Sequence, residues 1–178
     1  MIWPLNRNRD LDRMRPRLYR LAYAWCHDPH LADDLVQEAL SKAMTTSSLL
    51  KEARAMECWM MSILNNCWRD HLRARKDHDD IDQWSESLQS LEPGPEEQYA
   101  EQQLANQVRR AIGALPLSQR QVLTLVDLED CSYAEVAAIL GVPAGTVMSR
   151  LSRARLALKE SLQPMRPAVA TPQLRRVK

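Results

Sequence analysis

Apolar residues recur at three- and four-residue steps through most of this chain, and no long stretch alternates apolar and polar residues. This spacing places side chains along one face of an α-helix, whereas a half-buried strand needs a period of two. One such series comprises Leu11, Met14, Leu18, Leu21, Ala22 and Trp25. Only four glycines occur among 178 residues. The pattern therefore predicts an all-α protein.

The first half is expected to hold three helices, at about residues 10–27, 30–44 and 57–76. The first should end at Asp28, because a residue that precedes proline avoids the helical conformation. In the second helix, acidic and amide side chains are predicted to occupy the exposed face. Four consecutive hydroxyl residues, Thr45 to Ser48, then indicate a loop.

The second half contains a pattern typical of a helix-turn-helix. Ser132 and Glu135 have the spacing of a capping box, Gly141 is suited to a tight turn, and a new helix is expected near Pro143. The polar residues predicted to project from that second helix are Thr146, Ser149, Arg150 and Arg153. Arginine can bond guanine through two hydrogen bonds, so these residue types suit reading of a DNA major groove. The alternative is a charged, solvated face on a small helical bundle.

The formal net charge of +1 conceals three unlike segments. Residues 1–76 carry +4, residues 77–108 carry −9 and residues 109–178 carry +6. This distribution predicts two small helical domains, at 8–76 and 108–163, joined by a flexible acidic linker at 77–107, in which a helix can start at Glu96. A disordered basic tail is expected at 164–178. The linker is either a solubilising tether or a segment whose charge keeps it off nucleic acid or fills a basic groove.

Several functional classes are not supported. No apolar run approaches the roughly 20 residues that span a bilayer, and the first residues lack the apolar stretch of a signal peptide, so a cytoplasmic location is expected. The four cysteines and four histidines form no metal-ligand or catalytic pattern, and no phosphate-binding glycine loop occurs. We expect no enzymatic activity, no cofactor and no metal.

Two ordered sets of motifs resemble the extracytoplasmic-function (ECF) sigma factors of the sigma-70 family. The stretch from Gly141 to Arg155, with Leu115-Pro116 and Ser132 to Ala137 before it, resembles region 4. Independently, Ala32 to Ala39 resembles region 2.2, and Trp59 to Arg75 resembles regions 2.3 and 2.4. The runner-up interpretation is a stand-alone helix-turn-helix regulator that binds an operator without polymerase.

The resemblance implies a transcription initiation factor with three binding surfaces. The residues implied in docking to core RNA polymerase are Asp33, Asp34, Leu35, Gln37 and Glu38. Those implied in recognition and melting of the promoter −10 element are Trp59, Asn65, Asn66, Arg69, Asp70 and Arg73, together with a base pocket formed partly by the loop at about 45–56. Those implied in reading the −35 element are Thr146, Ser149, Arg150, Arg153 and Arg155. An anti-sigma factor that masks these surfaces is a further implied partner.

This sequence departs from the family pattern at Asn65 and at positions beside the other implied site residues. Ser62 and Asn65 stand where arginines are common, which weakens the expected phosphate contact. Met61 replaces a common aromatic residue, and Met148 stands where arginine is frequent. Trp59 and Trp68 are expected in the core rather than as stacking platforms for bases.

The length of the linker allows a test of consistency. Two promoter elements about two duplex turns apart are separated by ~70 Å. A flexible coil of this length spans only about 30 Å, but the same chain reaches ~110 Å when fully extended. The two domains can therefore reach both elements only when the linker is drawn out.

Overall fold

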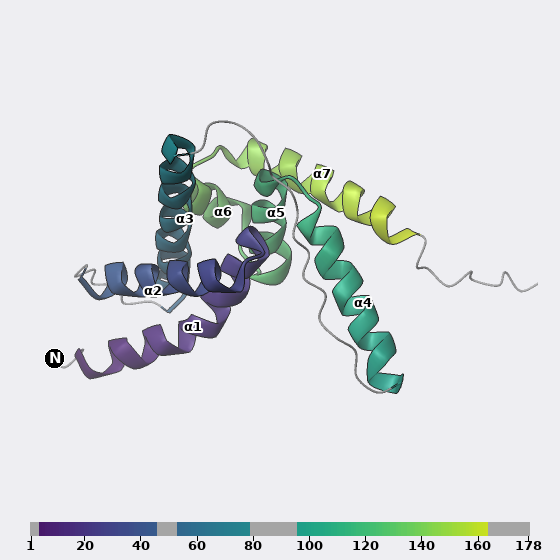
Figure 1. Cartoon of the computed structure of the whole chain (residues 1–178). Helices are drawn as coiled ribbons and strands as arrows, with labels where there is room; N and C mark the ends of the chain where they lie inside the picture. The colour runs from purple at the N-terminus through teal and green to yellow at the C-terminus, as the bar shows by residue number, and fades with distance from the viewer. Residues whose placement is uncertain (1–3, 46–52, 79–95, 164–178) are drawn as a thin grey trace, which may run out of the picture.

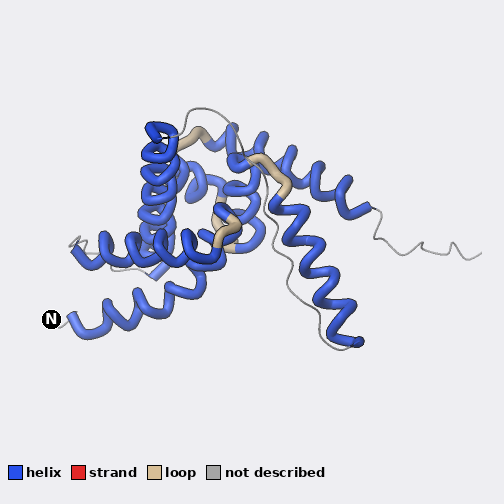
Figure 2. Tube along the Cα trace, viewed as in Figure 1, coloured by secondary structure: helices blue, strands red, loops and turns tan. Residues whose placement is uncertain are grey.

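The computed structural model describes residues 4–45, 53–78 and 96–163, and all of its regular elements are helical (Figure 2). Along the chain these are α1 (Pro4–Cys26), α2 (Pro29–Thr45), α3 (Ala53–His78), α4 (Glu96–Gly113), α5 (Leu117–Leu123), the π-helical turn η1 (Thr124–Leu128), α6 (Tyr133–Leu140) and α7 (Ala144–Leu162). The all-α prediction is confirmed.

The first three helices form one bundle, in which α1 and α3 each pack against α2 (Figure 1). The apolar series predicted for the first helix is buried, from Leu11 at 3% exposed to Trp25 at 1%. The break between α1 and α2 falls at Asp28 as expected. Its carboxylate accepts hydrogen bonds from the backbone N–H groups of His30 at 2.9 Å and Leu31 at 3.1 Å, which satisfies donors that a helix start leaves unpaired.

The helix-turn-helix forms as the sequence predicts. Ser132 and Glu135 make the reciprocal capping box, and α6 ends at Gly141, whose φ of +67° lies in the left-handed region that favours glycine. Helix α7 then begins at Ala144, after Pro143. Between α5 and α6, the π-helical turn η1 was not anticipated; it puts Thr124 and Leu125 into the core.

The two predicted domains are packed against each other and share one continuous hydrophobic core. In Figure 1, α6 lies directly beside α3, and α5 packs against α1. The buried indole of Trp25 donates from Nε1 to Thr124 Oγ1 at 3.0 Å across this junction. Each half alone offers little apolar surface to bury, so the shared core enlarges the interior that stabilises both.

The segment predicted as a linker is partly helical, because α4 starts at Glu96 and continues across the expected domain boundary to Gly113. No glycine or proline interrupts residues 96–112, which allows the helix to extend through them. The rest of the predicted linker, 79–95, and the tail at 164–178 lie outside the described residues. Within the described part of the chain, no single helix is long and apolar enough to cross a membrane; α6 and α7 together meet that requirement by length and composition but are bent by 103°.

Candidate nucleic-acid and polymerase interfaces

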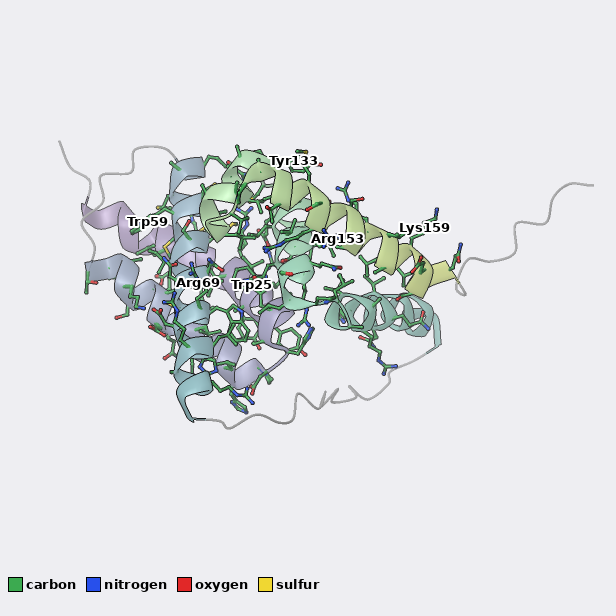
Figure 3. The ribbon with its side chains drawn as sticks, turned by 90° about the horizontal axis from the view of Figure 1, so that it is seen from above. Trp25, Trp59, Arg69, Tyr133, Arg153 and Lys159 are labelled. Atoms are coloured by element: carbon green, nitrogen blue, oxygen red, sulfur yellow. The ribbon has the colours of Figure 1, made fainter. Side chains whose placement is uncertain are left out.

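Helix α7 presents the predicted −35-reading residues from its first turn to its middle. Its buried side holds Val147, Leu151 and Ala154 against the core, so the opposite side faces solvent. Ser149 and Arg153 are exposed there, and Thr146 and Arg150 are half-buried. Figure 3 shows Arg153 on the same helix as the more distal Lys159. This is the arrangement that insertion of a helix into a major groove requires.

Arg155 differs from its predicted partners, because it is already bound within the second half. Its guanidinium donates to the Asp127 carboxylate from Nη2 at 2.6 Å and from Nε at 3.2 Å. These hydrogen bonds raise the pKa of Arg155 further. In this arrangement the side chain ties α7 to η1, and a DNA phosphate would compete with Asp127 for it.

The predicted −10 residues on α3 divide into an exposed and a covered group. Asn66, Arg69, Asp70 and Arg73 are exposed at three- and four-residue steps, so they share one face of the helix. Asp70 forms ion pairs with Arg73 at 3.4 Å and with Lys42 at 3.6 Å. The base-pocket loop predicted at about 45–56 falls mostly outside the described residues, since 46–52 are not described.

Asn65 lies in the covered group, at the junction of the two halves. Only 2% of it is exposed. Its amide donates to the backbone oxygen of Ile139 at 3.1 Å, and its Oδ1 accepts from Gln121 Nε2 at 3.1 Å. Ile139 belongs to the last turn of α6, whose carbonyls lack partners within the helix. DNA could reach Asn65 only after the second half moves away.

The two tryptophans of α3 are held by the protein interior to different degrees. Trp68 is buried, and its ring stacks on that of His71 with centroids 5.8 Å apart. Trp59 is half-buried and packs against the core at the left of Figure 3. The expectation of a core role is met by Trp68, whereas Trp59 keeps part of its ring at the surface.

The predicted docking face on α2 carries acidic groups at its surface. Asp34 and Gln37 are exposed, whereas the carboxylates of Asp33 and Glu38 pair with Arg15 at 3.1 Å and Lys42 at 2.7 Å. Leu35 does not lie on this face: it is 2% exposed and packs in the core. The helical period explains the difference, because Leu35 falls on the apolar stripe with Ala32 and Ala39. Leu35 can support a docking surface only from beneath.

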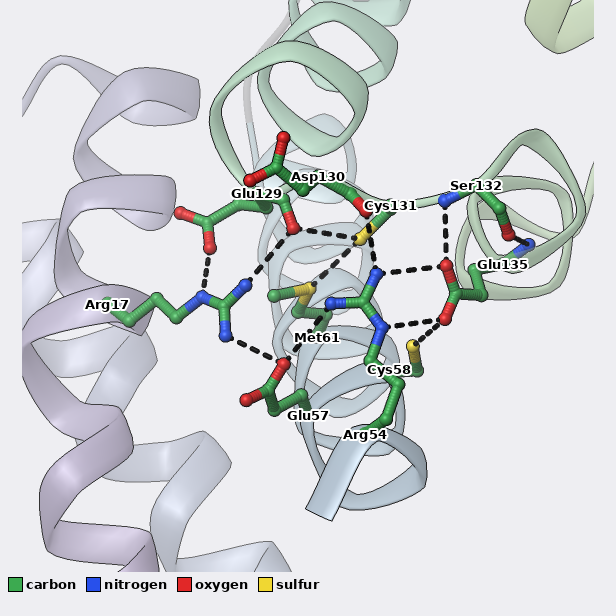
Figure 4. Close-up of polar contacts among 10 residues, drawn as sticks. All are labelled: Arg17, Arg54, Glu57, Cys58, Met61, Glu129, Asp130, Cys131, Ser132 and Glu135. Carbon is green, nitrogen blue, oxygen red and sulfur yellow. Dashed lines mark hydrogen bonds and ion pairs between the residues drawn. The ribbon is translucent and has the colours of Figure 1, made fainter. Parts of the chain in front are cut away.

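Charged residues of both halves come together at their junction, a grouping that no sequence pattern predicted (Figure 4). Arg54 of α3 donates to the Glu135 carboxylate from Nε at 2.8 Å and from Nη2 at 3.0 Å, and also to the backbone oxygen of Asp130 at 2.8 Å. Arg17 of α1 bonds the carboxylate of Glu129, which is nearly buried. We call Arg17, Arg54, Glu129 and Glu135 the interdomain ion cluster.

The hydrogen bonds of this cluster shift the pKa values of its members. The bonds from Arg54 hold the pKa of the Glu135 carboxyl well below its usual range, with a further contribution from the backbone N–H of Ser132. The bond to Glu135 in turn raises the pKa of Arg54. Glu135 therefore stabilises the arrangement while it is ionised. The contribution of Glu135 to folding stability is fully present above its ordinary pKa of about 4.3. It is lost as the pH falls below that value, toward the lowered pKa of the folded protein.

Cys58 lies against the same carboxylate, with its Sγ donating to Glu135 Oε1 at 3.2 Å. Burial and this hydrogen bond raise the pKa of the Cys58 thiol from 9.0 to about 11. Because the thiolate is the reactive form, we expect iodoacetamide to alkylate Cys58 about 100-fold more slowly at pH 8 than an unperturbed thiol. The rate should rise until the pH passes about 11.

Mass spectrometry of the Cys58 peptide after timed alkylation between pH 7 and 12 measures this profile. Glu135→Gln removes the neighbouring negative charge and should move the midpoint downward. A midpoint near pH 8.5 in the unmodified protein would contradict the assignment.

Among the described residues no group of three histidine, cysteine, aspartate or glutamate side chains is placed to hold a metal ion.

Comparison with known proteins identifies both halves. The model of Sigma-70 region 2 matches residues 11–78, and that of Sigma-70, region 4 matches residues 105–158. The chain is 34% identical over 149 residues to the ECF RNA polymerase sigma factor EcfG of Rhodopseudomonas palustris, covering 83% of this chain and 80% of that protein. The RNA polymerase sigma-H factor of Pseudomonas aeruginosa is 31% identical over 158 residues, covering 84% of this chain and 82% of its own.

Other relatives extend the comparison. The ECF RNA polymerase sigma factor SigE of Mycolicibacterium smegmatis is 32% identical over 155 residues, covering 82% of this chain but only 57% of that protein. Among solved structures, the sigma factor RpoE in complex with the anti-sigma factor NepR from Bartonella quintana superposes with a TM-score of 0.65 at 27% identity, covering 89% of this chain and 97% of that one. The presence of region 2 does not favour a stand-alone operator-binding regulator. The chain therefore belongs to the ECF sigma factors of the sigma-70 family, which are transcription initiation factors and not enzymes.

Proposed function

We propose that this protein binds core RNA polymerase through the acidic face of α2 and directs it to promoters whose −35 element is read by α7 and whose −10 element is captured by α3. The observation that carries the proposal is the ordered pairing of regions 2 and 4 in one chain. Most candidate residues of both regions are exposed. The exceptions are Asn65 and Leu35, which are buried, and the half-buried positions described above. Region 4 reads duplex DNA, and region 2 captures an opened strand, where contacts to bases and backbone offset the cost of unstacking.

Transcription in vitro with purified core polymerase tests the proposal. Addition of the protein to core polymerase and genomic DNA should produce a defined set of transcript starts that share two elements upstream. Absence of such starts, together with a palindromic site bound by the protein alone, would contradict it. The cytoplasm is the location that this activity requires.

An anti-sigma factor is the partner that the relatives suggest, since the Bartonella quintana protein was solved bound to one. The surfaces it would need to mask are the exposed residues on α2, α3 and α7. Co-purification of a tagged copy from the native host, followed by loss of in vitro transcription on adding the captured protein, tests this assignment.

Arg153→Ala is expected to reduce discrimination of the −35 element by ~1–3 kcal/mol, because one bidentate contact to a base is worth about that much. Binding to core polymerase should not change, since Arg153 is exposed on α7, away from α2. Competition between matched and mismatched promoter fragments measures the effect on the holoenzyme. Lys159→Ala, an exposed cation two turns further along α7, is the matched control. Equal losses on both fragments would indicate a phosphate contact instead.

A further inference from the structure

The interdomain ion cluster places two carboxylates of region 4 on two guanidinium groups of region 2 (Figure 4). Arg17 and Arg54 also converge on one oxygen of Glu57, with Nη1 of each arginine at 2.8 and 3.3 Å from Oε2. Three carboxylates thus serve two arginines, and two of the three come from region 4. A guanidinium binds carboxylate and phosphate with the same forked geometry, so the same site can accept phosphate oxygens.

The position of the two arginines suits a role in contact with DNA. Arg54 stands on α3 about two turns before Ser62, and Asn65 follows on the same helix. Ser62 and Asn65 are uncharged and supply no positive charge to this part of α3. Arg54 and Arg17, both paired with Glu57 of α3, place two guanidinium groups beside it, in addition to the exposed Arg69 and Arg73 further along the helix.

The arrangement of the two halves prevents DNA from reaching this face. Asn65 is enclosed by Gln121 and Ile139 of region 4, and Trp25 and Thr124 are hydrogen-bonded within the shared core. Two promoter elements ~70 Å apart cannot be read by two domains that share one core. Promoter binding therefore requires region 4 to leave region 2, which also removes Glu129 and Glu135 from the arginines.

We propose that Arg17 and Arg54 form a site for backbone phosphates of the promoter strand, and that Glu129 and Glu135 occupy this site in the free protein, so that region 4 competes with DNA for region 2. The proposal rests on the function proposed above. After separation only Glu57 remains on the two guanidinium groups, and the excess positive charge is available to phosphate. Opening of the chain thus replaces the ion pairs of the arginines with Glu129 and Glu135 by ion pairs with DNA phosphates, with no net loss of ion pairs.

The double variant Glu129→Gln/Glu135→Gln tests the carboxylate side of the site. Glutamine at position 135 keeps the capping box, so α6 retains its N-terminal hydrogen bonds. In the full chain we expect a larger radius of gyration by small-angle X-ray scattering. We also expect at least tenfold tighter binding of a labelled random single strand of about 12 nucleotides by fluorescence anisotropy. The exposed pair Asp12→Asn/Glu160→Gln makes the same charge change and should alter affinity less than twofold.

Adding Arg17→Ala and Arg54→Ala to the double variant tests the arginine side. The chain should remain open but lose the gain in affinity. The slope of log affinity against log salt should fall by about 1.4, since each phosphate contact on a single strand contributes about 0.7. Circular dichroism verifies that each variant is folded.

Two results would overturn the proposal. If the glutamine variant has the radius and affinity of the unmodified protein, the carboxylates do not hold the closed form. If the fourfold variant binds DNA as tightly as the glutamine variant, the arginines are not a phosphate site. Transcription with core polymerase, measured on the unmodified chain, tests the proposed function separately, so failure of one assay can be distinguished from failure of the other.

Discussion

Arg120→Met is expected to lower the free energy of unfolding by about 3–5 kcal/mol, because it removes hydrogen bonds from several buried carbonyls at once. Arg120 is a buried cation of α5. It donates from Nη1 to Trp25 O at 3.0 Å, and from Nη2 to Gly113 O at 2.7 Å and Leu115 O at 3.0 Å. These acceptors belong to the end of α1 and to the end of α4 with its turn, which the guanidinium joins to α5.

Methionine fills a similar volume without donors, so the carbonyls would remain desolvated and unpaired. Thermal unfolding followed by circular dichroism should show a midpoint lowered by roughly 10 °C for a chain of this size. Arg20→Met, at an exposed position of α1, removes the same charge and should shift the midpoint by less than about 2 °C. A loss below about 1 kcal/mol at position 120 would show that water or neighbouring groups replace the guanidinium.

Asp34→Arg is expected to weaken binding to core polymerase by at least tenfold, since a like charge placed across a complementary surface costs several kcal/mol. Asp34 is exposed on α2, so the substitution should leave the core intact. The affinity can be measured by titration of labelled protein with core polymerase at fixed salt. The effect should shrink as salt is raised, because exposed charges are screened.

The control for this charge reversal is Asp12→Arg, which makes the same change at an exposed position of α1. It should leave polymerase affinity within about twofold of the unmodified protein. If Asp34→Arg bound core polymerase with unchanged affinity, the acidic face of α2 would not be the docking surface. Promoter discrimination by Arg153→Ala provides the complementary test, because that variant should retain polymerase binding.

The local architecture could be predicted from the sequence because it depends on short-range patterns. The apolar series ending at Trp25 has the helical period, Asp28 precedes a proline, and Ser132 and Glu135 have the spacing of a cap. Each of these signals lies within a few residues of the structure that it specifies. The exposure of Ser149 and Arg153 on α7 followed from the same periodicity.

The prediction was less complete where one side chain had to be assigned to a surface or to the core. The predicted docking residues include Leu35 beside its acidic neighbours, although the helical period places Leu35 on the buried side of α2. The predicted −10 residues include Asn65 beside exposed residues of α3, and no local pattern indicates that Ile139 and Gln121 enclose it. Helix α4 begins at Glu96, where the sequence allowed a helix to start within the predicted linker, but it continues across the expected boundary to Gly113.

The sequence by itself determined the helices, the helix-turn-helix and the membership of the ECF sigma factors, because all three depend on residues close together in the chain. The tertiary structure alone decided how region 4 rests on region 2. The bonds of Arg17 and Arg54 to Glu129 and Glu135, and those of Arg120 to the end of α1, join residues separated by about 80 to 110 positions. Such pairs have no periodic signature, since their proximity arises only when apolar faces of both halves are buried in one core.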